Sequence, residues 1–265
     1  MNRIDNKFTQ LRASGKKAFI AFLTAGDPDL AATEKLILAF ERAGVDIVEI
    51  GVPFSDPLAD GPTIQAASYR SLQKGTTLAA ILELVKRVRR HSDIPLALMT
   101  YYNPVFNFGE EKFALQARAA GVDGIIIPDL PLEEANSWRA VAAREGLAAV
   151  FFLAPTTGRE RMGAVAKAST GFIYYVSIAG ITGARQAVPS EIVAKIRLAK
   201  TLTDKPVCVG FGVSTPAQAS AMARIADGVI VGSAIVKEIN SNAKAKDMPR
   251  RVQRFVAGLV RAVKR

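Results

Sequence analysis

Short apolar runs alternate along the chain with segments in which apolar residues recur every three or four positions. The runs are rich in β-branched residues and predict eight strands, at 18–26, 45–53, 94–102, 122–129, 147–155, 171–180, 205–212 and 226–233. Segments between them, such as 29–44 and 110–121, have the spacing of amphipathic helices. Gly44, Gly121 and Gly146 stand where a helix should end before the next strand. The pattern therefore predicts a repeated strand–helix unit.

Strands that are apolar throughout, each followed by a helix, are typical of a parallel sheet covered on both faces. Eight such units favour a closed (β/α)₈ TIM barrel over a doubly wound sheet. A doubly wound sheet usually opens with a G-x-G-x-x-G turn after its first strand, whereas the turn here reads TAGDPDL. Because one barrel needs about 250 residues, we expect residues 1–265 to form a single α/β domain.

The composition of the chain limits the cellular compartments in which we expect the protein. The chain has 265 residues, of which 49% are hydrophobic, and its one cysteine, Cys208, has no partner for an internal disulfide. The N-terminal segment lacks the apolar centre of a signal peptide, and no apolar run is long enough to cross a bilayer. We therefore expect a cytoplasmic protein that does not bind a membrane.

The formal net charge of +11 raises the question of an acidic partner such as nucleic acid. Much of the excess lies in 86–90 and 250–265, where basic and apolar residues alternate at helical spacing. That spacing favours solvated helix faces over nucleic-acid binding. We expect no nucleic-acid partner.

In barrel enzymes the catalytic groups lie at the carboxyl ends of the strands and in the loops that follow. Glu49 stands near the end of the second apolar run, on the same side as Ile47 by two-residue alternation. Burial would raise its pKa and suit it to general acid catalysis, although a buried structural ion pair is an equal alternative. Asp56 and Asp60 follow in a Pro- and Gly-rich loop, as turn or capping residues or as a second carboxylate converging on the same cavity.

Glycines gather in the loops after the last three strands, which read SIAGITGAR, GFGVST and VGSAIV. Glycine lets backbone amides approach a ligand closely. Gly232 and Ser233 open a helical segment, whose N-terminus would offer free N–H groups to an anion. Because phosphate sites in this fold often use these loops, the three together indicate a phosphate-binding site.

Several chemistries are disfavoured. No lysine lies at the end of a predicted strand, which argues against a Schiff-base aldolase. The one histidine, His91, precedes the third strand and so lies at the opposite end of the barrel from the expected site. With no ligand-like cluster of His, Cys and carboxylates, we expect no metal site. Carboxylates must then carry most of the acid–base work.

The motifs VEIGVPFSDPLADGPTIQ, MTYYNPVF, GIIIPDLP, YYVSIAGITGAR, GFGVST and IVGSAIV closely resemble the tryptophan synthase alpha chain family. The likeness runs from the first predicted strand to the C-terminal helices. It implies a lyase of tryptophan biosynthesis that splits indole-3-glycerol phosphate into indole and glyceraldehyde 3-phosphate. It also implies that Glu49 protonates the indole C3, that Asp60 accepts a hydrogen bond from the indole N–H, and that Tyr174 assists.

The resemblance implies the substrate contacts as well. For the phosphate they are Gly183, Phe211, Gly212, Gly232 and Ser233. For the indole ring the apolar slot is formed by Phe22, Ile64, Met99, Tyr101, Ile126, Phe152 and Phe211. Asp56 matches a loop residue tied to closure and to communication with a partner, and Ile178 stands where some members carry an arginine.

The implied partner is a tryptophan synthase beta chain in an α₂β₂ heterotetramer, with indole channelled between the subunits. The resemblance implies no cofactor on this chain, because pyridoxal phosphate belongs to the beta chain. Two alternatives remain: a phosphate-binding barrel acting on another phosphorylated substrate, and a catalytically weak barrel that serves mainly to activate a beta-chain partner.

Overall fold

The computed structural model describes residues 2–176, 188–210 and 212–265. Its parallel strand segments form one sheet in the order β5-β4-β3-β2-β1-β9-β8-β7-β6. Their bounds are β1 Ala18–Thr24, β2 Ile47–Gly51, β3 Leu96–Met99, β4 Gly124–Ile126, β5 Ala148–Val150, β6 Phe152–Leu153, β7 Ile173–Val176, β8 Val207–Gly210 and β9 Gly228–Val231.

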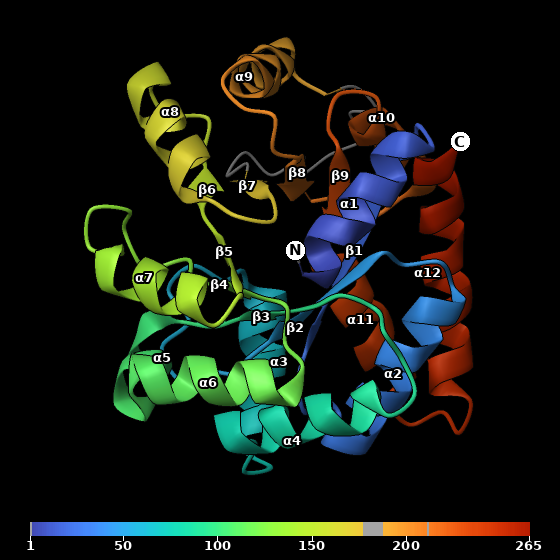
Figure 1. Cartoon of the computed structure of the whole chain (residues 1–265). Coiled ribbons are helices and arrows are strands. Elements are labelled where there is room, and N and C mark those ends of the chain that lie inside the picture. The colour runs from blue at the N-terminus through green and yellow to red at the C-terminus, as the bar shows by residue number, and fades with distance from the viewer. Residues whose placement is uncertain (1, 177–187, 211) are drawn as a thin grey trace.

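The sheet closes on itself through its fifth strand. Only Phe151 separates β5, which pairs with β4, from β6, which pairs with β7. Phe151 also accepts a hydrogen bond at its carbonyl oxygen from Tyr174 N, at 3.0 Å. The nine segments are therefore eight strands in a ring (Figure 1), which confirms the (β/α)₈ prediction and shows the doubly wound alternative to be wrong.

Helices surround the ring and connect its strands (Figure 1). Their bounds are α1 Arg3–Ala13, α2 Leu30–Arg42, α3 Pro62–Leu72, α4 Leu78–Arg89, α5 Tyr102–Phe108, α6 Glu110–Ala120, α7 Asn136–Arg144, α8 Arg159–Ala168, α9 Ser190–Thr201, α10 Pro216–Ala223, α11 Ser233–Asn242 and α12 Met248–Lys264. Gly44, Gly121 and Gly146 have φ values of 87°, 95° and 68°, which a residue without a Cβ adopts at little cost and which suit a helix end. Within the described ranges, no helix is long and apolar enough to cross a membrane.

The hydrogen-bonded strands are shorter than the apolar runs that predicted them. The second run covers 45–53, for example, whereas β2 covers Ile47–Gly51. Val45 and Val52, outside that strand, are 5% and 8% exposed. Both residues are buried beside the helices. The apolar runs therefore follow burial, which extends past the residues whose backbones form the hydrogen bonds of the sheet.

Two apolar layers hold the barrel together. One face of each strand packs against the helices, as Phe19 and Val48 do beside Leu36 and Phe40 of α2. The alternate residues fill the interior of the ring; they include Ile20, Ile47, Ala97, Ile126, Val150, Tyr174, Cys208 and Ile230. The interior is thus a packed core, as expected for a barrel of eight strands.

Helix α1 closes the end of the ring where the strands begin. Its Ile4 is fully buried and packs closely on two glycines, since a Cβ on Gly124 would stand 2.9 Å from Ile4 Cδ1 and one on Gly171 3.2 Å from Ile4 Cγ2. The rings of Phe8 and Phe172 have their centroids 5.9 Å apart. The hydrophobic pattern of the sequence did not predict this helix. Because α1 covers this end, the opposite end of the barrel is the only open one within the described residues.

Three aspartates at the same end tie neighbouring strands together. Asp46, Asp123 and Asp227 immediately precede β2, β4 and β9, respectively. The carboxylate of each accepts a hydrogen bond from a backbone N–H at or beside the start of the adjacent strand. These bonds run from Phe19 N at 2.7 Å, from Leu96 N at 2.9 Å and from Val207 N at 3.1 Å, respectively. The aspartates of the segments AGVD (43–46), AGVD (120–123) and IAD (225–227) therefore have a structural role, and we call them structural pins because each joins two strands.

Asp123 is the most deeply buried of these pins and gives a test of stability. Its carboxylate also accepts from Arg89 Nη2 at 2.7 Å and Arg3 Nη1 at 3.1 Å, so Asp123→Ala leaves Arg89, which is mostly buried, without its carboxylate partner. We expect the free energy of unfolding to fall by about 3–5 kcal/mol, measured by urea denaturation. Asp93→Ala removes an exposed partner of Arg3 and serves as the control; equal losses in the two variants would contradict the assignment.

Candidate active site

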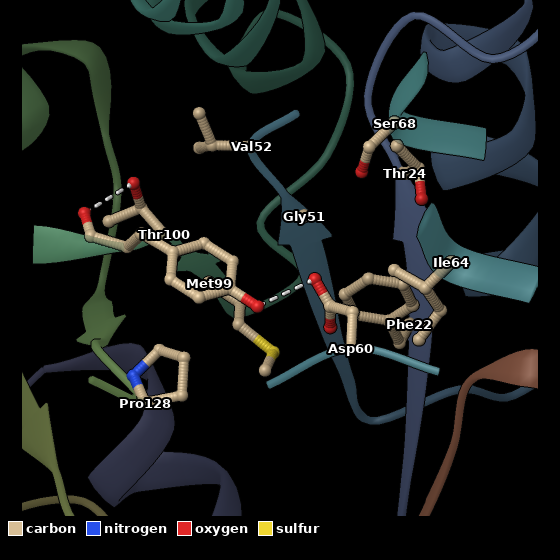
Figure 2. Close-up of a pocket in the computed structure, with 11 residues that line it drawn as sticks. Phe22, Thr24, Gly51, Val52, Asp60, Ile64, Ser68, Met99, Thr100 and Pro128 are labelled. Carbon is tan, nitrogen blue, oxygen red and sulfur yellow. Dashed lines mark hydrogen bonds between the residues drawn. The ribbon is translucent and has the colours of Figure 1, made fainter. Parts of the chain in front are cut away.

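The open end of the barrel contains two adjoining hollows. The larger has a volume of about 370 Å³ and lies between the loops after the last strands; its walls are Phe22, Ile64, Met99, Tyr174, Gly210, Gly212, Val213, Ser214, Ile230, Gly232, Ser233, Ala234 and Lys237. The smaller is drawn in Figure 2, and its walls are Phe22, Thr24, Gly51, Val52, Asp60, Ile64, Ser68, Met99, Thr100, Tyr101 and Pro128. Phe22, Ile64 and Met99 belong to both, so the two hollows adjoin, with Asp60 in the wall of the smaller and Ser233 in the wall of the larger.

Glu49 lies inside the barrel beside this site. It is in register with Phe22 on β1 and stands two residues before Gly51, both of which line the smaller hollow. The side chain is fully buried, and within the described residues neither carboxylate oxygen has a hydrogen-bond partner. Loss of water raises its pKa to about 8. The structural ion pair considered above is therefore not formed by any residue that the structure describes.

Asp60 reaches the site from the loop between β2 and α3. Its Oδ2 accepts a hydrogen bond from the Tyr101 hydroxyl at 3.1 Å, and Figure 2 shows its carboxylate close to Phe22 and Ile64. Burial raises its pKa, and the bond from Tyr101 partly offsets that rise. The helix behind it begins with Pro62 after Gly61, without a side-chain cap. Asp60 is thus free of the capping role that the sequence left open.

Tyr101 fixes the shape of this loop. Its hydroxyl accepts from Ala59 N at 2.9 Å while it donates to Asp60. The ring stacks on Phe54, with 5.2 Å between the centroids. Burial and then the neighbouring charge of Asp60 raise the pKa of Tyr101 above its ordinary value. One phenol therefore holds the segment from Phe54 to Asp60 over the barrel.

Tyr174, on β7, lines the larger hollow, whereas Asp60 lines the smaller one. A Cβ on Gly210 would stand 2.7 Å from the Tyr174 hydroxyl and ring, so the glycine makes room for the tyrosine. Burial raises the pKa of Tyr174 well above its ordinary value, and the charges of Glu49, Cys208 and Asp60 raise it further. Gly210 and Tyr174 both line the larger hollow, so this glycine borders the cavity as well as making room for the tyrosine.

The loops after β8 and β9 meet where we expected a phosphate site. Gly212, Gly232 and Ser233 all line the larger hollow. Helix α11 has no side-chain cap and no acidic residue in its first turn, and Val236 N donates to Gly232 O. Among the described residues, no acceptor binds the N–H groups of Ser233, Ala234 and Ile235, so a ligand could use them. The neighbouring α10 differs, because Gln218 and Thr215 form a capping box there.

The remaining residues singled out in the sequence fall into four groups. Ile126 is fully buried in the barrel core, and Phe152 packs on Tyr174 with 4.9 Å between centroids; neither is part of the walls described above. Asp56 is exposed and accepts from Ser55 Oγ at 2.6 Å, away from Glu49. Gly183, Phe211 and Ile178 lie outside the described residues. His91 is exposed before β3, at the end of the barrel away from the site, as expected.

Five polar residues in the walls were not predicted from the sequence: Thr24, Ser68, Thr100, Ser214 and Lys237. Thr24 ends β1, and its buried hydroxyl has no partner among the described residues. Ser214 follows the GFGV loop, and Lys237 lies one helical turn after Ser233. The end-of-strand rule could have found Thr24, whereas nothing in the local pattern distinguishes Lys237 from a solvated lysine. The described residues contain no group of three or more His, Cys, Asp or Glu side chains arranged to hold a metal ion.

Comparison with known proteins agrees with this geometry. Residues 8–264 match the model of the family described as "Tryptophan synthase alpha chain". The tryptophan synthase alpha chain of Geotalea daltonii is 51% identical over 98% of each chain, and that of Geobacter sulfurreducens is 50% identical over 99% of each.

Solved structures give the same result. The alpha subunit of tryptophan synthase from Legionella pneumophila superposes with a TM-score of 0.93 at 37% identity, covering 99% of this chain and 98% of the other. A chain of tryptophan synthase from Mycobacterium tuberculosis in its aminoacrylate-bound form has a TM-score of 0.89 at 34% identity, with full coverage of both. Since the family model and these relatives span almost the whole sequence, the chain belongs to the tryptophan synthase alpha chain family.

Proposed function

We propose that this chain cleaves indole-3-glycerol phosphate to indole and glyceraldehyde 3-phosphate by a retro-aldol reaction, as the alpha subunit of tryptophan synthase. Family membership supports the reaction, and one observation supports its assignment to particular residues. That observation is Glu49, a carboxyl group buried without a partner in the described structure beside a cavity of suitable size.

Glu49 is the general acid. With a pKa of about 8 it carries its proton at neutral pH, as protonation of the indole C3 requires. The C3–C bond to the glycerol chain then breaks, and its electron pair returns to the indole ring. The hydroxyl on the departing carbon becomes the aldehyde by losing its proton, which the Glu49 carboxylate takes up. Glu49 thus ends the cycle protonated, as it began, and neither a lysine adduct nor a metal ion is needed.

Asp60 stabilises the intermediate. Protonation at C3 places positive charge on the ring nitrogen, and the carboxylate of Asp60 accepts the hydrogen bond from that N–H. The bond from Tyr101 holds the carboxylate in the hollow. Phe22, Ile64 and Met99 supply an apolar wall for the indole ring. Tyr174, in the wall of the larger hollow, assists by excluding water and by hydrogen bonding through its hydroxyl.

The phosphate of the substrate binds at the other end of the site. The uncapped first turn of α11 and the backbone of Gly212 supply N–H groups and the positive end of a helix dipole. We further propose that Gly183 and Phe211 complete this site and the indole slot, as the family resemblance implies. Ile126 and Phe152 then support the slot from behind its walls.

Family membership supports a proposal for the partner subunit, the cofactor requirement and the cellular location. The partner is a beta chain in an α₂β₂ complex, and Asp56, exposed in the β2–α3 loop, is placed to report closure of that loop to the partner. This chain itself needs no cofactor, since the chemistry is acid–base. We propose that residues 1–265 form one domain and that the protein works in the cytoplasm, where its buried Cys208 stays reduced.

Glu49→Gln should abolish the reaction. Glutamine has nearly the same shape but no proton to donate to C3, so we expect kcat for indole release to fall by at least about 1,000-fold. Indole formation from indole-3-glycerol phosphate is followed by absorbance or chromatography, with the melting temperature as the control for folding. Turnover near that of the wild type would refute the role of Glu49.

Asp60→Asn tests the negative charge of Asp60 while it keeps the size and shape of the side chain. The amide oxygen can still accept from Tyr101, so the loop keeps its place, but the negative charge opposite the indole nitrogen is lost. We expect kcat to fall by about 100-fold with a much smaller change in KM. The measurement is steady-state indole release. A loss confined to KM would instead make Asp60 a binding residue.

The raised pKa of Glu49 predicts a particular pH dependence. Because the acid form is required, kcat/KM should decline as the pH rises through about 8. Stability should change in the same direction. The folded protein keeps this proton, whereas the unfolded chain releases it near the ordinary value of 4.5, so the stabilisation present below pH 4.5 is lost as the pH rises to about 8.

Urea denaturation of the wild type and Glu49→Gln between pH 4.5 and 9 measures the contribution of Glu49 protonation to stability. The variant lacks the titrating group. As the pH rises from 4.5 to about 8, the free energy of unfolding of the wild type should therefore fall relative to that of the variant. Parallel profiles would show that Glu49 titrates normally in the folded protein.

A further inference from the structure

Lys237 is a cation in the wall of the larger hollow. It is the only charged side chain among the described residues that line it. It lies four residues after Ser233 on α11, so the two share one face of the helix. Cα–Cβ bonds of a helix tilt toward its N-terminus, so the Lys237 side chain leaves the helix on the side of the first turn. Lys237 lines the same hollow as Ser233 and Ala234, whose N–H groups we assign to the phosphate.

Lys237 is an exposed lysine on the second turn of α11. No ion pair to it is formed by the part of the chain that the structure describes. The adjacent carboxylate, that of Glu238, accepts instead from Asn242 Nδ2 at 2.9 Å, toward the other end of the helix. A cation near the positive end of a helix dipole is unfavourable by itself. An anion placed between the two would turn that repulsion into attraction on both sides.

We propose that the Lys237 ammonium pairs with the phosphate group of the substrate, so that the site binds it by a mobile cation as well as by fixed backbone amides. This proposal rests on the function proposed above and adds a residue to it. Lys237 lies at the phosphate end of the site, away from Asp60, which lines only the smaller hollow. Its attraction is the same before and during bond cleavage, so it should lower KM and leave kcat unchanged.

The test compares Lys237→Gln and Lys237→Arg with Lys244→Gln. Lys244 is exposed beyond the end of α11 and lines neither hollow, so it controls for the loss of one surface charge. At low salt we expect Lys237→Gln to raise KM for indole-3-glycerol phosphate by about fivefold at constant kcat, and Lys237→Arg to restore most of the loss. Unchanged KM in Lys237→Gln, or an equal rise in Lys244→Gln, would overturn the proposal.

A second arm does not depend on turnover. Inorganic phosphate is titrated into each protein by calorimetry, and we expect weaker binding to Lys237→Gln alone, by a factor similar to the rise in KM. Equal binding by all variants, or none by the wild type, would overturn the role of Lys237. If the wild type binds phosphate through Lys237 but releases no indole, the reaction assigned to this chain fails while the Lys237 assignment stands.

Discussion

An ionisable group sealed inside an apolar ring is the constraint on which the site depends. Glu49 is fully buried, and the described residues provide its carboxylate with no hydrogen bond. Such a group is costly to ionise, so the protein holds it as an acid at neutral pH. This requires closure of the ring, because an open sheet would expose one of its edges. The break between β5 and β6 at Phe151 leaves the ring closed.

The two ends of the barrel are built for different purposes. Where the strands begin, α1 covers the core, and Asp46, Asp123 and Asp227 satisfy backbone N–H groups of neighbouring strands. Where the strands end, the N–H groups at the start of α11 are left uncapped and face a cavity. Polar groups satisfied internally stabilise the fold, whereas those left available can bind a ligand.

Glycine and aromatic residues shape the space between these groups. A Cβ on Gly51 would stand 2.5 Å from the Phe22 ring, and Gly210 makes the same kind of room for Tyr174. The two rings occupy the space that side chains at these positions would take, and both line the larger hollow. The two glycines therefore set where these aromatic walls of the cavity stand.

The sequence by itself determined the repeating strand–helix unit, the glycine helix ends and the inward direction of Glu49, because these depend on periods of two and 3.6 residues within one segment. It located Asp60, Gly212, Gly232 and Ser233 through motif resemblance. Only the tertiary structure decided that Tyr101 holds Asp60, that Lys237 shares a cavity with Gly212, and that α1 covers the barrel. Those neighbours come from distant parts of the chain, and closure of the ring, which no local period encodes, brings them together.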